Sequence, residues 1–374
     1  MIRLLIGCLA IFMISCKKEQ RDIPTEISQS SVKYAQGFSI SKQGNNTVLS
    51  VTKAFSESEK SYRYLLVPEG NDRTDSGYDA IIEVPIKEIV VTSTTHIPSL
   101  EQLGEAQSLI GFPGTDYISS EHTRKRIAKG LVTELGQNES LNTEIVLDLR
   151  PDAIVAFGVE GENKALNTIQ QAKIPVLYNG DWLEKSPLAK AEWLKFFGAL
   201  YNKEVLADSL FQDIELRYKA VQKKTQTIQE KPTVLSGAMY KDVWYLPYGD
   251  SWAGQLIKDA GGMYLWEETK GSGSISLSLE SVLDQGQQAE LWIAPGQYDS
   301  YSNLEKANMV YTHFDAYKKQ EIYNFTHRKG ETGGLLYYEL APNRPDIVLK
   351  DMAAILHPYL FPDYQPYFFA PLAE

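Results

Sequence analysis

The chain has 374 residues, a formal net charge of −11 and 43% hydrophobic residues. The excess of carboxylates excludes a protein whose main task is to bind nucleic acid or anionic lipid head groups. A chain of this length buries more than one hydrophobic core, so two domains are expected. Both cysteines, Cys8 and Cys16, lie near the N-terminus, and the remainder therefore folds without disulfides or free thiols.

Residues 1–15 have the features of a lipoprotein signal peptide. Arg3 supplies a positive charge, and the apolar run over 4–14 is too short to span a bilayer. The stretch Met13-Ile14-Ser15-Cys16 resembles a bacterial lipobox, although leucine is more usual than Met13. Cys16 is therefore the predicted lipidation site, which acyl chains would anchor to the envelope membrane. The alternative is an ordinary secretory signal with an incidental cysteine.

The residues after the signal are expected to form a polar tether over 16–30 and then an N-terminal lobe over 31–200. Alternating residues on either side of Gly44-Asn45-Asn46 predict a hairpin, and Pro85 indicates an edge or a break at the end of a later strand. Beyond residue 88, short apolar strands alternate with helices, which predicts a parallel, doubly wound sheet. The first expected strand contains Phe38 and Ile40, which alternate with serines. The further expected strands are 47–52, 62–67, 80–86, 89–92, 109–112, 153–157 and 175–178, and the expected helices are 98–103, 144–149 and 163–172.

A long helical region over 201–230 is expected to join the two lobes. Helical character begins at Ser186-Pro187, a typical cap followed by a first-turn proline, and is interrupted near 198–202. Residues at a spacing of four predict one buried face of this helix, namely Leu206, Leu210, Ile214 and Tyr218.

Strand and helix alternation resumes over 231–374, which predicts a C-terminal lobe. Strands are expected at 233–238, 291–294 and 322–325, and helices at 251–260, 279–284 and 345–356. The predicted fold is thus α/β, with two doubly wound lobes joined by one long helix and an extra β-rich segment on the first lobe. A ligand would bind between the lobes, at the loops that leave the strand ends.

Two stretches carry a family resemblance, NTEIVLDLRPDAIVAF at 142–157 and GDSWAGQLIKDAGG at 249–262. They resemble the class III substrate-binding proteins of ABC importers, the family that binds ferric siderophores, haem and cobalamin. The resemblance extends from about residue 90 to the C-terminus. It implies a periplasmic, lipid-anchored protein that is not an enzyme and needs no cofactor of its own. The resemblance also implies that the protein delivers a metal chelate to an ABC permease dimer with its ATPase.

The resemblance also implies two docking glutamates, one on each lobe, that contact arginines of the permease. The first corresponds to Glu162, with Glu160 as the rival assignment, and the second corresponds to Glu280. Exposed carboxylates on separate lobes would set the register on a symmetric permease. Glu280 is equally explained by its place near a helix start, where a negative charge is favoured.

The expected ligand contacts are aromatic side chains in loops after strands, because aromatic walls bind planar or chelated ligands with few rotatable bonds. Arg344, just before a helix, is the expected partner of an anionic group. Trp193 and Trp292 are assigned to the core instead. The candidate ligand-binding residues are His96, Tyr117, Trp182, Tyr240, Trp244, Tyr245, Tyr248, Trp252, Tyr298, Tyr337 and Arg344.

Three alternatives remain at this point. A bare zinc or manganese ion needs several converging ligands, whereas the five histidines are scattered along the sequence. An envelope hydrolase on an α/β scaffold would need a nucleophile motif such as Gly-x-Ser-x-Gly, which the sequence lacks. A purely structural envelope lipoprotein is the third. We favour a ferric chelate as ligand, with cobalamin or haem as the alternatives.

Overall fold

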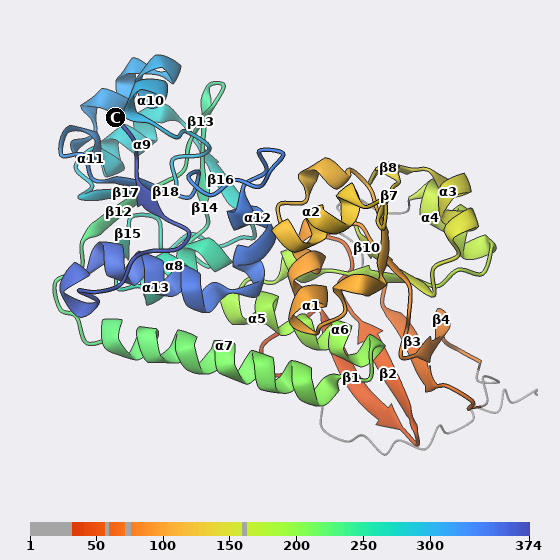
Figure 1. The fold of residues 1–374 in the computed structure, drawn as a ribbon. Coiled ribbons are helices and arrows are strands. Elements are labelled where there is room, and N and C mark those ends of the chain that lie inside the picture. Colours follow the sequence, from red (N-terminus) through yellow and green to blue (C-terminus); the bar gives the residue numbers. More distant parts are fainter. Residues whose placement is uncertain (1–31, 57–59, 72–75, 159–162) are drawn as a thin grey trace, which may run out of the picture.

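The computed structural model describes residues 32–56, 60–71, 76–158 and 163–374. They form two α/β lobes, and helix α7 (Glu204–Thr225) runs along both of them (Figure 1). Each lobe has its own mainly parallel sheet and its own cluster of buried apolar side chains, so the expected fold class is confirmed. The predicted signal peptide, the tether and Cys16 lie outside the described residues.

The chain first forms a four-stranded sheet in the order β1-β2-β3-β4. The expected hairpin is present as the antiparallel pair β1 and β2, and Gly44 at its turn has a φ of 59° that glycine adopts without strain. Strand β4 lies at the sheet edge and ends before Pro85, as predicted. The ring of Phe38 lies 4.5 Å from that of Trp193, which joins this sheet to the core of the first lobe. The strands are Phe38–Gln43, Asn46–Val51, Tyr62–Pro68 and Ala80–Val84.

The main sheet of the first lobe has five parallel strands in the order β11-β10-β5-β6-β7. The chain runs outward from β5 to β7 and then returns to β10, so the order reverses between β5 and β10. Such a reversal leaves a crevice at the carboxyl ends of the two strands. The strands are β5 (Ile89–Val91), β6 (Leu109–Phe112), β7 (Thr133–Glu134), β10 (Ala153–Phe157) and β11 (Val176–Asn179).

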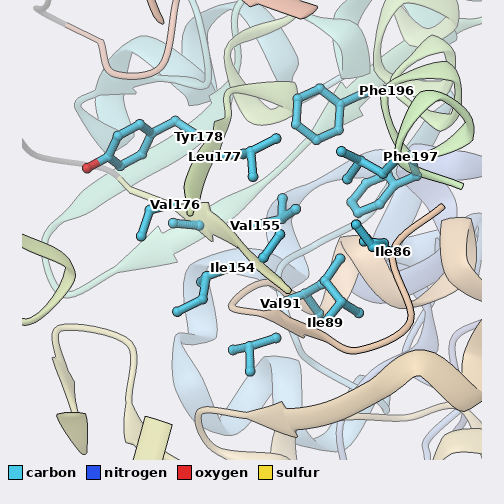
Figure 2. Packing of buried hydrophobic residues seen from close by; sticks show 14 of the residues in the cluster. Ile86, Ile89, Val91, Ile154, Val155, Val176, Leu177, Tyr178, Phe196 and Phe197 are labelled. Atoms are coloured by element: carbon cyan, nitrogen blue, oxygen red, sulfur yellow. The ribbon is translucent and has the colours of Figure 1, made fainter. Parts of the chain in front are cut away.

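Four helices and a small hairpin complete the first lobe. Three of the helices begin at side chains that accept a backbone hydrogen bond, because Ser120, Asn142 and Asn163 each cap an otherwise unpaired N–H. The helices are α1 (Ile97–Gln102), α2 (Glu121–Ala128), α3 (Thr143–Leu149) and α4 (Lys164–Gln171), and the hairpin strands are β8 (Gly136–Gln137) and β9 (Ser140–Leu141). Figure 2 shows how β5, β10 and β11 pack toward Phe196 and Phe197.

Three consecutive helices connect the lobes: α5 (Pro187–Glu192), α6 (Leu194–Leu200) and α7. The interruption expected near 198–202 is confirmed, since α6 ends at Leu200 and α7 begins at Glu204. At Gly198 a Cβ atom would lie only 2.5 Å from the Cβ of Ala207, so glycine allows α6 and α7 to approach.

The buried face of α7 differs from the predicted one. Leu206 is 42% exposed and Leu210 is only partly buried, whereas Ile214 and Tyr218 are buried as expected. A spacing of four residues drifts around a helix, whereas alternating spacings of four and three stay on one face. The buried residues follow that alternation, at Ala207, Phe211, Ile214, Tyr218, Val221 and Thr225.

The second lobe has a sheet in the order β15-β12-β17-β18-β19, parallel except for β19. Ser251 caps α8 as the sequence predicted, and Trp292 is fully buried, as Trp193 nearly is in the first lobe. The strands are β12 (Thr233–Ser236), β15 (Met263–Tyr264), β17 (Leu291–Ile293), β18 (Ile322–Asn324) and β19 (Ala370–Pro371). The helices anticipated from the sequence are α8 (Trp252–Asp259), α9 (Leu279–Gly286) and α13 (Pro345–Leu356).

Several elements of the second lobe were not predicted. A three-stranded antiparallel sheet lies beside the main one, and short helices fill the connections after β17 and β18. These elements are β13 (Ala238–Tyr240), β14 (Val243–Pro247), β16 (Ser274–Leu277), α10 (Tyr301–Ala307), α11 (Asp315–Lys318) and α12 (Leu336–Leu340).

Candidate functional site

A cavity of about 520 Å³ opens between the lobes. The first lobe contributes residues that follow β5 and β6, the end of β10 and the β8-β9 hairpin, and the second lobe contributes α12 and the residues before it. The site thus lies at the switch point of the first sheet, where ligands of α/β proteins bind. The described lining residues are Thr92, Ser93, Thr94, Phe112, Pro113, Tyr117, Gln137, Asn138, Glu139, Phe157, Gly334, Leu335, Tyr338 and Glu339.

Hydrogen bonds between loops hold the first-lobe wall in place. The Thr92 hydroxyl accepts from the backbone N–H of Phe157 at 2.8 Å, which joins the loops after β5 and β10. The Asn138 side chain donates to the carbonyl oxygen of Phe157 at 3.3 Å, and the Asn163 side chain donates to that of Asn138 at 3.1 Å. The wall is therefore largely formed without a ligand, which lowers the entropy lost on binding.

The second-lobe wall is attached to the first lobe through Glu339 of α12. This buried carboxylate accepts from the backbone N–H groups of Ser119 at 2.7 Å and Ser120 at 2.9 Å. Burial raises the pKa of Glu339 to about 7; the bond from Ser119 lowers it, nearby Glu101 raises it, and the bond from Ser120 lowers it. A group with a pKa near 7 changes charge at physiological pH, at the edge of the cavity.

A second connection between the lobes is made by Asn343, directly after α12. Its side-chain oxygen accepts from the Ser99 hydroxyl at 2.9 Å, and its nitrogen donates to the carbonyl oxygen of Thr95 at 2.8 Å. Because a buried amide with both ends paired is costly to separate, the lobes are fixed at this point. The cleft therefore has a stiff base beside its open cavity.

The structure places the candidate residues of the first lobe in three environments. Tyr117 lines the cavity and is 74% exposed. Trp182 does not line it, but its ring lies 6.1 Å from that of Phe157, and its indole nitrogen has no partner among the described residues. His96 is fully buried against Phe197, so the expectation that it contacts a ligand is corrected. Burial lowers the pKa of His96 to about 4.

None of the candidate aromatic residues of the second lobe lines the cavity. Trp244 is a core residue, with 0% exposure and a ring 5.4 Å from that of Trp292, and Tyr337 is buried on Phe325 at 4.2 Å. Three of these candidates, Tyr240, Trp244 and Tyr245, lie on β13 and β14, where the sequence predicted loops. The remaining candidates outside the cavity wall are Tyr240, Tyr245, Tyr248, Trp252 and Tyr298.

Arg344 is also absent from the cavity wall. Its guanidinium pairs with both carboxylate oxygens of Asp346, each at 2.9 Å, and this carboxylate raises the pKa of Arg344 against the lowering effect of burial. Asp346 also accepts from Arg217 of α7. The Arg344–Asp346 pair therefore lies at the start of α13, and Arg344 is not among the residues that line this cavity.

The docking candidates differ in what the structure describes. Glu162 and its rival Glu160 lie outside the described residues. Glu280 is exposed in the first turn of α9, where its own backbone N–H and the Ser278 side chain lower its pKa. Glu280 is therefore a solvent-exposed carboxylate at a helix N-terminus, where a negative charge is favoured.

Sequence reasoning missed most of the cavity wall. Thr92 ends the predicted strand over 89–92 and Ser93 and Thr94 follow it, so their position was the one signal in the sequence for this part of the wall. The β8-β9 hairpin and α12 are too short to leave a periodic pattern. Their contribution depends on which loops the fold brings together.

Two further observations concern the described part of the chain. No helix in it combines the length and apolarity needed to cross a bilayer. Within the same residues, no group of three or more His, Cys, Asp or Glu side chains is arranged to hold a metal ion.

Comparisons with known proteins agree with this architecture. The sequence profile described as periplasmic binding protein matches residues 89–328. An uncharacterized lipoprotein of Methanocaldococcus jannaschii is 27% identical over 299 residues, which cover 77% of this chain and 69% of that protein.

Solved structures share the fold at low identity. A possible iron-binding, periplasmic solute-binding protein of Staphylococcus epidermidis has a TM-score of 0.57 and 18% identity, covering 73% of this chain and 99% of its own. A periplasmic haem-binding protein of Vibrio cholerae has a TM-score of 0.55 and 16% identity, covering 70% and 99%. The profile matches most of the chain, and the chain therefore belongs to the periplasmic binding protein family.

Proposed function

We propose that this protein is the substrate-binding lipoprotein of an ABC importer, which captures a metal chelate between its lobes and delivers it to a membrane permease. The observation that supports this most directly is the interlobe cavity of about 520 Å³ at the switch point of the first sheet. A volume of this size is typical of small-molecule sites. Ferric siderophores are the favoured ligands, and cobalamin or haem are the alternatives within the same family.

The same proposal covers the envelope location and the partners. Cys16 would carry the lipid anchor, and the polar tether would let the folded part reach the permease. Glu280 on the second lobe and Glu162 on the first would dock onto cations of the permease dimer. Such rim charges set the rate of encounter and the register of the complex more than its affinity.

The alternative of an envelope hydrolase has no support, because the family consists of solute-binding proteins. Turnover of ester, phosphate and glycoside reporters by the purified chain would revive it, provided that one point substitution abolished the activity. Without turnover, a non-enzymatic binding protein is the simpler account.

Thermal unfolding of the purified chain tests the proposal. Ferric siderophores, haem, cobalamin, zinc and manganese are added separately, because a ligand that binds only the folded state raises the Tm by mass action. At about 100 times its Kd, one such ligand stabilises the folded chain by about 2.7 kcal/mol. A chelate should raise the Tm, whereas a shift with zinc or manganese alone would contradict chelate capture.

A further inference from the structure

The walls of the interlobe cavity carry no positive charge among the described residues. The lining side chains are hydroxyls, amides, aromatic rings, aliphatic groups and two carboxyls, those of Glu139 and Glu339. Glu139 is exposed on the β8-β9 hairpin, whereas Glu339 is buried on the opposite wall.

Two cations that bond to segments beside the cleft, Arg124 and Lys190, are engaged by other groups. Arg124 of α2 donates to the carbonyl oxygen of Thr115 at 2.7 Å and lies within 3.9 Å of the carboxylates of Asp116 and Glu331. Lys190 of α5 is buried and donates to two carbonyl oxygens at 3.0 Å each. Neither residue lines the cavity, and Arg344 is paired with Asp346.

This arrangement has a consequence for the charge of the ligand. An anion that enters the cavity loses part of its hydration and meets the carboxylate of Glu139, and that of Glu339 where it is ionised, rather than ammonium or guanidinium groups. Hydroxyl and amide groups can donate hydrogen bonds, but they do not supply the opposite charge that a buried anion needs. Polar groups without net charge are well matched to such a wall, because hydroxyls and amides both donate and accept.

On this basis, and resting on the proposed function, we propose that the cavity selects chelates that are neutral or cationic and rejects polyanionic ones. The favoured class is a large, metal-bearing ligand whose periphery carries amides, hydroxyls or hydroxamates. Chelates that expose several carboxylates or catecholates would be bound weakly. This selectivity is the opposite of the one that the sequence suggested, in which Arg344 would bind an anionic group of the ligand.

Two pairs of chelates that differ mainly in charge test this selectivity by titration calorimetry of the full chain at neutral pH. The first pair is a neutral ferric trihydroxamate and a trianionic ferric tris-catecholate. The second pair is dicyanocobinamide, whose ring carries amides, and cobyrinic acid, which has carboxylates in their place. If the protein binds the chelates of a pair, it should bind the neutral one about 100-fold or more tightly than the anionic one.

A charge reversal on the cavity wall sharpens the test. Glu139→Lys should raise the affinity for the anionic member by about tenfold relative to the affinity for the neutral member. Glu144→Lys is the matched control, because Glu144 is exposed in the first turn of α3, does not line the cavity, and changes the net charge equally. An equal response to both variants would mean that overall charge, not the cavity wall, governs the preference, which overturns the proposal.

The possible failures are distinguishable. If an anionic chelate binds as tightly as its neutral counterpart or more tightly, the charge selectivity is wrong, but chelate capture stands. If no chelate of either charge binds, the proposed function is wrong and the selectivity falls with it.

Discussion

The carboxylate of Glu339 accepts a hydrogen bond from the backbone N–H of Ser119 on the opposite lobe, at 2.7 Å. Its other oxygen accepts from Ser120, so α12 of the second lobe is connected to the start of α2 in the first. With the pair of bonds made by Asn343, this gives the cleft two fixed points beside its cavity. Rocking of the lobes then requires these bonds to break or to move as a unit.

Glu339→Ala should destabilise the chain by about 1–3 kcal/mol, because two buried N–H groups lose their acceptor. The free energy of unfolding in urea measures the effect, and small-angle scattering reports whether the lobes separate further. Glu331→Ala is the control, since Glu331 is 76% exposed and lies 3.8 Å from Arg124. That variant should stay within about 0.5 kcal/mol of the parent. If both variants lost the same unfolding free energy, the interlobe hydrogen bonds of Glu339 would contribute no more to stability than the exposed contact of Glu331.

The raised pKa of Glu339 gives stability a defined pH dependence. Because burial raises the pKa of this carboxyl from 4.5 to about 7, the folded chain binds more protons than the unfolded chain between these values. The contribution of Glu339 to stability therefore falls as pH rises through this window, by about 3 kcal/mol in total. Relative to Glu339→Gln, which cannot ionise, the parent should lose about 3 kcal/mol of unfolding free energy between pH 4.5 and 7. A difference that is constant with pH would contradict this assignment.

His96 should act in the opposite direction. Burial lowers its pKa from 6.5 to about 4, with Asp181 partly raising it, and neither ring nitrogen has a hydrogen-bond partner among the described residues. The folded chain then binds fewer protons than the unfolded chain between pH 4 and 6.5, so stability rises with pH there, by about 3 kcal/mol. His96→Leu should remove this rise in urea titrations. Since His96 and Glu339 oppose each other, the parent should show a shallower profile than either variant.

Substitutions at Trp244 and Tyr117 should distinguish a residue that packs in the core from one that contacts the ligand. Trp244→Ala should cost about 3–5 kcal/mol of unfolding free energy, because the ring is fully buried and its indole N–H donates to the Ser236 carbonyl at 3.1 Å. Tyr117→Ala should leave the unfolding free energy within about 0.5 kcal/mol and weaken chelate binding by about tenfold or more. Denaturation and calorimetry on the same two samples give both quantities. If a well-folded Trp244→Phe variant lost chelate binding while Tyr117→Ala kept it, Trp244 and not Tyr117 would be the residue that contacts the ligand.

The sequence was most informative where local chemistry alone decides the structure. Most helix ends could be placed from capping residues, prolines and glycines, and the capping residues include Asn163, Ser186 and Ser251. The central parallel strands could be placed from runs of apolar residues. The hairpin at Gly44 followed from its turn chemistry. The lobes and their connecting helix were therefore predictable without coordinates.

The cavity wall was not predictable in the same way. Trp244 and Tyr245 alternate between buried and exposed on β14, a pattern that a loop assignment conceals. Glu339 acquires its role from Ser119, which is 220 positions away in the chain and on the other lobe. No local rule identifies such a contact, because it depends on how the two lobes are placed by the helices between them.

Glu280 tests the docking part of the proposed function. Glu280→Lys should leave chelate affinity nearly unchanged, since the side chain is exposed and is not among the residues that line the cavity. It should cost about 1 kcal/mol or less of unfolding free energy, because a negative charge is favoured in the first turn of α9. It should reduce the stimulation of ATP hydrolysis in the reconstituted permease by about tenfold, because a repulsive charge replaces an attractive one at the contact. Glu268→Lys, an equally exposed reversal in the same lobe, is the control and should stimulate normally. Matching losses in both would indicate a general charge effect, and no loss in either would remove Glu280 from the docking surface. A deficit confined to Glu280→Lys that weakens at high salt would place this glutamate at the permease, because screening reduces the repulsion.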